Sequence, residues 1–122
     1  MMARMSTTTV YGIPNCDTVK KARAWLTQHG VEHAFHDYKK AGVPVALLPQ
    51  WLGALGWQSL LNRKGPTWRK LDAALQATVV DDASATALMC AHSSVIKRPV
   101  VVWPDGRISV GFSPELFAAH RA

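Results

Sequence analysis

Two segments with strand patterns lie towards the two ends of this chain, and a long helical stretch separates them. Near the N-terminus, residues 7–12 (TTTVYG) are β-branched and aromatic and end on glycine, which is typical of a strand. Apolar residues then recur at helical spacing from residue 18 up to Gly30, and the alternating residues 33–38 indicate a second strand. Because a helix separates the two strands, we expect them to pair in parallel, as a β-α-β unit.

The C-terminal segment shows a different order of elements. The apolar run VVVW at 100–103 predicts a strand, Pro104-Asp105-Gly106 predicts a tight turn, and residues 107–110 (RISV) predict the partner strand of a hairpin. Residues 113–121 begin with serine and proline, which favour the start of a helix. A β-α-β unit followed by a β-β-α unit is the thioredoxin arrangement. The predicted class is therefore α/β, a thioredoxin-like fold with a mixed four-stranded sheet.

The stretch between these segments, about 44–94, is predicted to be an all-helical insertion. Residues 45–56 are apolar enough for a helix in which Pro49 lies in the first turn or marks the start. Residues 57–66 indicate a connection, and 67–77 indicate a short helix. We expect the 122 residues to form one domain with a loose N-terminus at residues 1–6.

A further helix of the insertion is predicted over residues 83–92, with Asp81 or Asp82 as its N-cap. Cys90 lies in this helix among apolar neighbours, and we expect it to pack in the core. The inner face of this helix is expected to consist of Ala83, Ala87, Leu88 and Ala91.

Positive charge predominates, since 14 Lys and Arg residues face 8 Asp and Glu residues and the net charge is +6. This balance favours anionic partners, such as oxyanions, acidic peptides or nucleic acid. The basic runs do not interleave with aromatics as in RNA-binding patterns, so we do not expect nucleic acid. No apolar stretch approaches the ~18 residues of a membrane span, and the first nine residues lack the apolar core of a signal peptide. We therefore predict a cytoplasmic protein with no membrane partner.

Cys16 is the predicted nucleophile. It lies where the first helix begins, after the first strand and the turn Gly-Ile-Pro-Asn. Unpaired backbone N–H groups, the helix dipole and the nearby Lys20 and Lys21 all favour its thiolate there. The carboxylate of Asp17 opposes ionisation unless it caps the helix. Asn15, Asp17, Thr18 and Lys20 are therefore candidate substrate-binding neighbours.

The third residue after Cys16 is Val19, at a position where thioredoxin-like active sites often carry a second cysteine. The two cysteines of the chain are 74 positions apart, so an internal Cys-x-x-Cys disulfide is impossible. Such a thiol must be resolved by an outside thiol, and glutathione is the abundant one in the cytosol. Neither the cysteines nor the five histidines have metal-ligand spacing, so no metal site is predicted.

The pair Arg98-Pro99 directly precedes the strand predicted at 100–103. Thioredoxin-like folds carry a cis-proline at this place, opposite the nucleophile loop. We expect the Arg98 guanidinium to reach Cys16, lower the thiol pKa and bind an oxyanion or carboxylate through paired hydrogen bonds. Pro99 completes this part of the candidate site, and Arg63 is a weaker candidate for anion binding.

Three motifs occur in order: YGIPNCDTVKKA at 11–22, LLNRKG followed by TWRKL within 60–71, and IKRPVV followed by VGFS within 96–113. Together they resemble the ArsC-like family of arsenate reductases and Spx regulators, and most of all its YffB-type branch. The resemblance covers the chain from residue 8 on. It implies a thioredoxin-like fold with a helical insertion and a nucleophile at Cys16.

In the arsenate reductases three arginines bind the oxyanion. The resemblance places the middle one at Arg98, the first at Asn62 with Arg63 one place on, and the third at or beside Gly111, where this chain has no arginine. It therefore favours the role assigned to YffB-type members, glutathione-dependent thiol reduction. The Spx regulators bind RNA polymerase and commonly carry a Cys-x-x-Cys switch, which Val19 removes here.

The sequence thus predicts a monothiol, glutathione-dependent thiol-disulfide oxidoreductase that works through a mixed disulfide on Cys16. No bound cofactor is implied, and glutathione serves as co-substrate. The expected partners are glutathione or a small anionic or disulfide substrate, with glutaredoxin as a further candidate, and we expect a monomer. Two alternatives stay open: an arsenate reductase that uses glutathione and glutaredoxin, and an Spx-like regulator that binds RNA polymerase.

Overall fold

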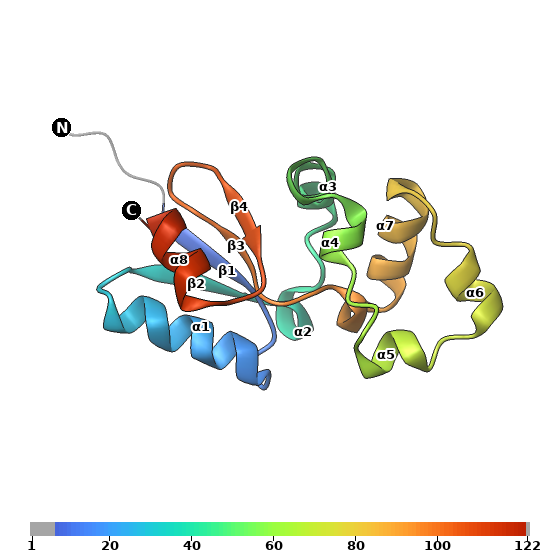
Figure 1. Cartoon of the computed structure of the whole chain (residues 1–122), viewed down its shortest axis with the longest axis horizontal. Helices are drawn as coiled ribbons and strands as arrows, with labels where there is room; N and C mark the ends of the chain where they lie inside the picture. Colours follow the sequence, from blue (N-terminus) through green and yellow to red (C-terminus); the bar gives the residue numbers. More distant parts are fainter. Residues whose placement is uncertain (1–6, 122) are drawn as a thin grey trace. The chain divides into compact units, whose positions relative to one another are not determined.

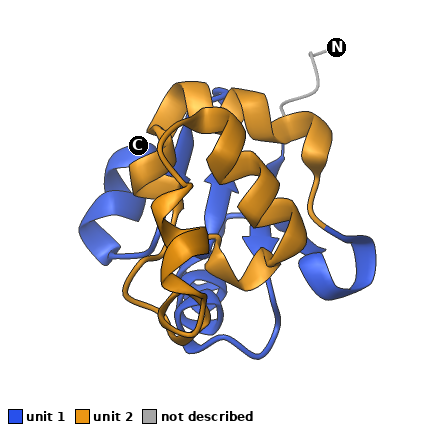
Figure 2. Ribbon diagram, turned by 90° about the vertical axis from the view of Figure 1, so that its right-hand side faces the viewer, with its two compact units in different colours: residues 1–42, 98–122 blue, residues 43–97 orange. Residues whose placement is uncertain are grey.

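The computed structural model describes residues 7–121, which form two compact units (Figure 2). The first unit contains the described residues up to 42 and those from 98 onwards, and the second contains residues 43–97. The loose N-terminus expected at residues 1–6 falls outside the described residues. No helix within residues 7–121 combines the length and apolar character that crossing a membrane would require.

The first unit contains a four-stranded sheet in the order β2-β1-β3-β4 (Figure 1). β1 pairs in parallel with β2 and antiparallel with β3, and β3 pairs antiparallel with β4. The predicted mixed sheet is confirmed, although the hairpin strands are each one residue shorter than expected. The strands are β1 (Thr8–Gly12), β2 (His33–Asp37), β3 (Val100–Val102) and β4 (Ile108–Val110).

Two helices, α1 (Asp17–Gln28) and α8 (Pro114–Arg121), cover one face of this sheet, and a short helix, α2 (Tyr38–Ala41), follows β2. Val10 and Val101 are paired across β1 and β3, and both contribute to a core that Leu26 of α1 and Phe117 of α8 complete. Full burial of a side chain such as Phe117 stabilises by about 1.5–3 kcal/mol. This shared core fixes the start of α1 beside the end of β1.

The second unit is built from helical segments, as predicted for this stretch of the chain. Within this unit, an isolated antiparallel β-bridge pairs Leu61 with Ile96. The segments are two 3-10 turns (Val45–Leu47 and Ser93–Val95) and the helices α3 (Leu48–Leu55), α4 (Trp57–Leu60), α5 (Pro66–Arg69), α6 (Ala73–Ala77) and α7 (Asp82–Ala91).

Several predicted bounds in this unit are wrong. The helix expected over 45–56 begins as a 3-10 turn and becomes α-helical at α3, and the connection expected at 57–66 begins with α4. The helix expected over 67–77 is divided into α5 and α6. The division has a local cause, because the Trp68 carbonyl accepts hydrogen bonds from the Leu71 N–H and the Gln76 side chain. A continuing α-helix would use that carbonyl for the N–H of residue 72.

The N-cap of α7 is confirmed, but its inner face is not the one predicted. Asp81 accepts a hydrogen bond from the Ser84 N–H, and Ser84 completes a capping box. The buried residues are Ala85, Leu88 and Met89, whereas Ala83, Ala87 and Ala91 are exposed. Successive residues of an α-helix are about 100° apart around its axis, so the residue that follows the buried Met89 points away from the buried face. Cys90 is accordingly exposed, and its predicted packing in the core is wrong.

Candidate active site

The candidate active site lies where β1 passes into α1. Cys16 is the N-cap residue of α1 and has an extended backbone, with φ −106° and ψ 123°. Its side chain makes no aligned capping hydrogen bond with the helix, yet the backbone N–H groups of Val19 and Thr18 lie close enough to stabilise its thiolate. The first turn of a helix has unpaired N–H groups, so such a position suits an anion.

The pKa of Cys16 results from opposing influences. Burial is the largest of them and raises the pKa of the thiol. The Val19 N–H, a hydrogen bond from Arg98, the charge of Arg98 and the Thr18 N–H all lower it. The lowering influences together outweigh burial, so the pKa of Cys16 lies below its ordinary value. The predicted approach of Arg98 to Cys16 is thus present in the structure, within one unit.

Gly12 allows β1 to pass close to both Val19 and Arg98. A methyl group on Gly12 would lie 2.8 Å from Cγ2 of Val19 and 3.9 Å from Cβ of Arg98. Val19 is fully buried, and its position three residues after Cys16 is therefore part of the packing of the first unit. A side chain at residue 12 would clash with Val19, whose N–H helps to stabilise the thiolate, whereas its contact with Arg98 would be an ordinary van der Waals one.

The peptide bond between Arg98 and Pro99 is cis, as the placement of this proline predicted. Pro99 is buried, and its carbonyl accepts a hydrogen bond of 2.9 Å from the Gly111 N–H. Gly111 has φ +84°, a conformation that favours glycine over any other residue. The resemblance placed a third arginine at or beside this residue, and at Gly111 itself the backbone conformation is unsuited to arginine.

The remaining predicted residues occupy different places. Asn15, Asp17 and Thr18 are exposed around Cys16, where solvent screens the charge of Asp17. Lys20 is also exposed, and its N–H donates to the Cys16 carbonyl over 2.9 Å as part of α1.

Arg63 belongs to the second unit. It is exposed, and its guanidinium carbon lies 5.9 Å from the centre of the Trp57 ring. The neighbouring Asn62 holds the turn that follows it, because its side-chain oxygen accepts from the Lys64 N–H. Its amide also lies so near Gly65 that a methyl group there would come within 2.7 Å. Asn62 thus has a local structural role.

Sequence reasoning missed Tyr38, which it treated only as the end of a strand. Tyr38 is buried, and its hydroxyl has no hydrogen-bond partner among residues 7–121. Burial raises the pKa of Tyr38 above its ordinary value, while the charge of Arg98 acts in the opposite direction. The phenol therefore lies within electrostatic range of Arg98. A buried tyrosine that follows an edge strand gives no local signal of such a neighbour.

No group of three His, Cys, Asp or Glu side chains within the described part of the chain could hold a metal ion.

A thioredoxin-like sheet, a cysteine at the start of α1 and a cis-proline before β3 together define the class of thioredoxin-like thiol proteins. Within this class, residues 11–120 match the ArsC family, and the chain belongs to that family.

Two relatives match most of the chain. An uncharacterized protein of Haemophilus influenzae is 40% identical over 91% of this chain and 96% of its own length. The global transcriptional regulator Spx of Streptococcus agalactiae is 27% identical over 88% of this chain and 77% of its own.

Two solved structures are similar over almost the whole chain. The YFFB (PA3664) protein has a TM-score of 0.87 and 50% identity, covering 95% of this chain and 100% of the other. An arsenate reductase (ArsC) related protein from Brucella melitensis has a TM-score of 0.73 and 46% identity, covering 98% of both chains. The present chain is thus arsenate reductase-like in fold.

Proposed function

We propose that this ArsC-family protein is a glutathione-dependent thiol reductase in which Cys16 is the single nucleophile. The observation that carries the proposal is the position of Cys16 beside the Val19 N–H and Arg98, which together lower the pKa of the thiol despite its partial burial. A thiolate is the reactive form in disulfide exchange, so a lowered pKa increases the reactive fraction at neutral pH. The buried Val19 occupies the place of a second cysteine, which supports a mechanism with an external resolving thiol.

The reaction proceeds in two exchanges. The Cys16 thiolate attacks one sulfur of a substrate disulfide that carries a glutathionyl group, forms a Cys16–glutathione disulfide and releases the other sulfur as a thiolate. The thiolate of a second glutathione then attacks the glutathionyl sulfur, which forms glutathione disulfide and returns Cys16 as a thiolate. The incoming glutathione thiolate supplies the electron pair: its sulfur enters a disulfide while the substrate sulfur leaves as a thiolate, and the glutathionyl sulfur stays in a disulfide throughout. The substrate thiolate takes up the proton that the incoming glutathione lost on ionisation.

Arg98 has a separate task in each state of this cycle. In the free protein its positive charge and hydrogen bond stabilise the Cys16 thiolate. Formation of the mixed disulfide removes the negative charge from Cys16, and the guanidinium then becomes available to a carboxylate of the glutathionyl group. The next exchange restores the thiolate and its attraction to Arg98, which favours release of glutathione disulfide.

Arsenate reduction is the less favoured alternative because of what occupies the other two family arginine positions. Asn62 holds a turn through its side chain, and Gly111 has a backbone conformation unsuited to arginine. An oxyanion at Cys16 would therefore meet Arg98 without those two arginines. An Spx-like regulator would bind RNA polymerase whether or not Cys16 is present. We further propose that the protein acts as a monomer in the cytoplasm.

The decisive experiment follows the reduction by glutathione of the mixed disulfide between glutathione and 2-mercaptoethanol, with glutathione disulfide measured through glutathione reductase and NADPH. We expect turnover by the wild type and by Cys90→Ser, and none by Cys16→Ser. Mass spectrometry after exposure to glutathione disulfide should find one glutathionyl group, on Cys16. Loss of turnover in Cys90→Ser would contradict the single-nucleophile mechanism. Arsenate-dependent turnover, or Cys16-independent capture of purified RNA polymerase, would support the respective alternative instead.

A further inference from the structure

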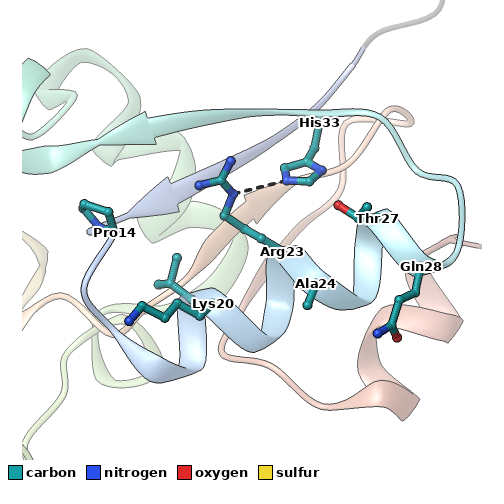
Figure 3. Close-up of a pocket in the computed structure, with 8 residues that line it drawn as sticks. Pro14, Lys20, Arg23, Ala24, Thr27, Gln28 and His33 are labelled. Carbon is teal, nitrogen blue, oxygen red and sulfur yellow. Dashed lines mark hydrogen bonds between the residues drawn. The ribbon is translucent and has the colours of Figure 1, made fainter.

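A groove lies between α1 and the edge strand β2, and it begins at the loop that carries Cys16 (Figure 3). Its volume is about 480 Å³, within the range of small-ligand sites, ~300–1,000 Å³. Pro14 lies at the end where the loop enters α1, and Thr27 lies towards the other end of the helix. We call this feature the α1–β2 groove; its remaining lining residues are Val19, Lys20, Arg23, Ala24, Gln28 and His33.

The charged side chains of the groove are all basic. Lys20 and Arg23 both line it, and no carboxylate does. The two residues are three positions apart on α1, so both are carried by the same side of the helix. Such an arrangement attracts an anionic group and discriminates against cationic ones.

The Arg23 guanidinium is held in place before any ligand arrives. Its Nε donates a 3.3 Å hydrogen bond to Nε2 of His33, and its central carbon lies 4.4 Å from the centre of the Phe35 ring. Figure 3 shows the guanidinium and the imidazole facing each other between α1 and β2. The two terminal Nη groups of Arg23 make no hydrogen bond among residues 7–121. They form the fork that suits a carboxylate, and little side-chain entropy remains to be lost on binding.

We propose that the α1–β2 groove binds a carboxylate of the short peptide whose sulfur is exchanged at Cys16. The proposal rests on the proposed function and names the part of the substrate that this function leaves open. Lys20 and Arg23 lie four and seven residues after Cys16, which corresponds to roughly 6–10 Å along the helix axis. An extended peptide covers that distance with two or three residues. The groove therefore selects a tripeptide-sized thiol with a carboxylate at its end, rather than a bare oxyanion.

The test compares three disulfides that differ in charge, in a Cys90→Ser background in which Cys16 is the one remaining thiol. They are glutathione disulfide, which carries carboxylates, neutral 2-hydroxyethyl disulfide, and cationic cystamine. The measured quantity is the second-order rate constant of Cys16 oxidation by each. Dividing the glutathione disulfide constant by the neutral one removes any general change in the reactivity of the Cys16 thiolate.

The variants are Lys20→Gln and Arg23→Gln, with Arg23→Lys as a charge-conserving variant. Lys21→Gln is the matched control, because Lys21 is an exposed lysine of the same helix that does not line the groove. We expect each groove variant to lower the rate ratio by about two- to fivefold, the effect of one partly screened charge pair. Arg23→Lys should recover part of the loss, and Lys21→Gln should stay close to the wild type. Equal ratios in groove variants and control would overturn the proposal.

A second measurement keeps this inference separate from the proposed function. S-methylglutathione has both carboxylates but cannot exchange its sulfur, so its binding can be followed by amide NMR shifts without any reaction. Shifts around Lys20, Arg23 and His33 that disappear in Arg23→Gln are the expected result. The absence of such shifts would contradict the proposal that the α1–β2 groove binds a carboxylate. Shifts accompanied by unreactive Cys16 would instead contradict the proposed thiol reductase activity and leave the carboxylate site in place.

Discussion

Gly12 at the end of β1 and Val19 in the first turns of α1 are packed so closely that a Cβ on residue 12 would lie 2.8 Å from Cγ2 of Val19. Carbon atoms that are not bonded prefer separations of about 3.5–4.0 Å, so a side chain at this position must move the helix or the valine. The Val19 N–H is one of the groups that lower the pKa of Cys16. The end of β1 is thus packed directly against a residue whose N–H stabilises the Cys16 thiolate.

Substitution Gly12→Ala is expected to have two effects. Overpacking against Val19 should reduce the free energy of unfolding by about 1–3 kcal/mol, and displacement of the Val19 N–H should raise the pKa of Cys16. Urea unfolding and the pH dependence of alkylation measure the two quantities. Because Val19→Ala removes the clashing methyl groups, Gly12→Ala should cost less stability in a Val19→Ala background than in the wild type. Equal costs in the two backgrounds would mean that the clash is not the cause.

Arg98→Ala should raise the pKa of Cys16, since both the hydrogen bond and the charge of Arg98 lower it. The rate of alkylation by iodoacetamide should reach half its maximum at a higher pH than in the wild type, and Arg98→Lys should lie between them. The pH dependence of stability gives a second measurement. A thiol pKa that is lower in the folded than in the unfolded state stabilises the protein at pH values above the unfolded-state pKa. This stabilisation is lost as the pH falls through the folded-state pKa of Cys16.

The linked measurement compares the wild type with Cys16→Ser over this pH range. The unfolding free energy of the protein with Cys16 minus that of its Cys16→Ser variant should increase with pH when Arg98 is present. The same difference should be nearly constant with pH when both proteins carry Arg98→Ala. An alkylation profile that is the same with and without Arg98 would count against the role assigned to this residue.

The buried hydrogen bond between Trp103 and Ser109 predicts a stability effect remote from the active site. The indole Nε1 donates to the Ser109 hydroxyl over 2.9 Å, and both residues are almost fully buried. Ser109→Ala leaves that N–H without a partner and should cost about 1–3 kcal/mol in unfolding free energy. A double-mutant cycle with Trp103→Phe isolates the hydrogen bond. Additive losses in this cycle would show that the bond does not contribute.

His120 should make the first unit less stable at acidic pH. Burial and the charge of Arg107 lower the pKa of His120, with Asp105 acting in the opposite direction, and the imidazole stacks on Trp103 at 5.3 Å. The unfolded chain therefore takes up the proton first, near its ordinary pKa of ~6.5. Stability falls as the pH drops through that value and levels off below the lower folded-state pKa. Urea midpoints between pH 8 and pH 5 should show this fall, and His120→Gln should reduce it.

Local patterns were sufficient for the parts of the fold and site that depend on neighbouring residues. The strand alternation, the cysteine at a helix start and the proline before β3 are all short-range features, and each occurs in the structure. The approach of Arg98 to Cys16 joins distant segments, and it was predicted because the thioredoxin arrangement places both residues at the same end of the sheet.

Other features depend on information that no local pattern contains. The orientation of α7 is set by which side of the helix finds apolar neighbours, so Cys90 could not be placed from helical spacing alone. At the break between α5 and α6, the Trp68 carbonyl accepts from the Leu71 N–H and from the side chain of Gln76, a residue eight positions further on. The orientation of the Arg23 guanidinium depends on its contacts with Phe35 and His33, and these residues come near Arg23 only when α1 packs against β2.

The contact between Cys16 and Arg98 also has a consequence for the newly made protein. Arg98 follows Cys16 by 82 positions, so the ribosome releases the cysteine long before the arginine is synthesised. Until β3 joins the sheet, the nascent chain has Cys16 without the charge and the hydrogen bond of Arg98. This part of the stabilisation of the thiolate therefore forms only when the first unit is complete, after the cysteine has left the ribosome.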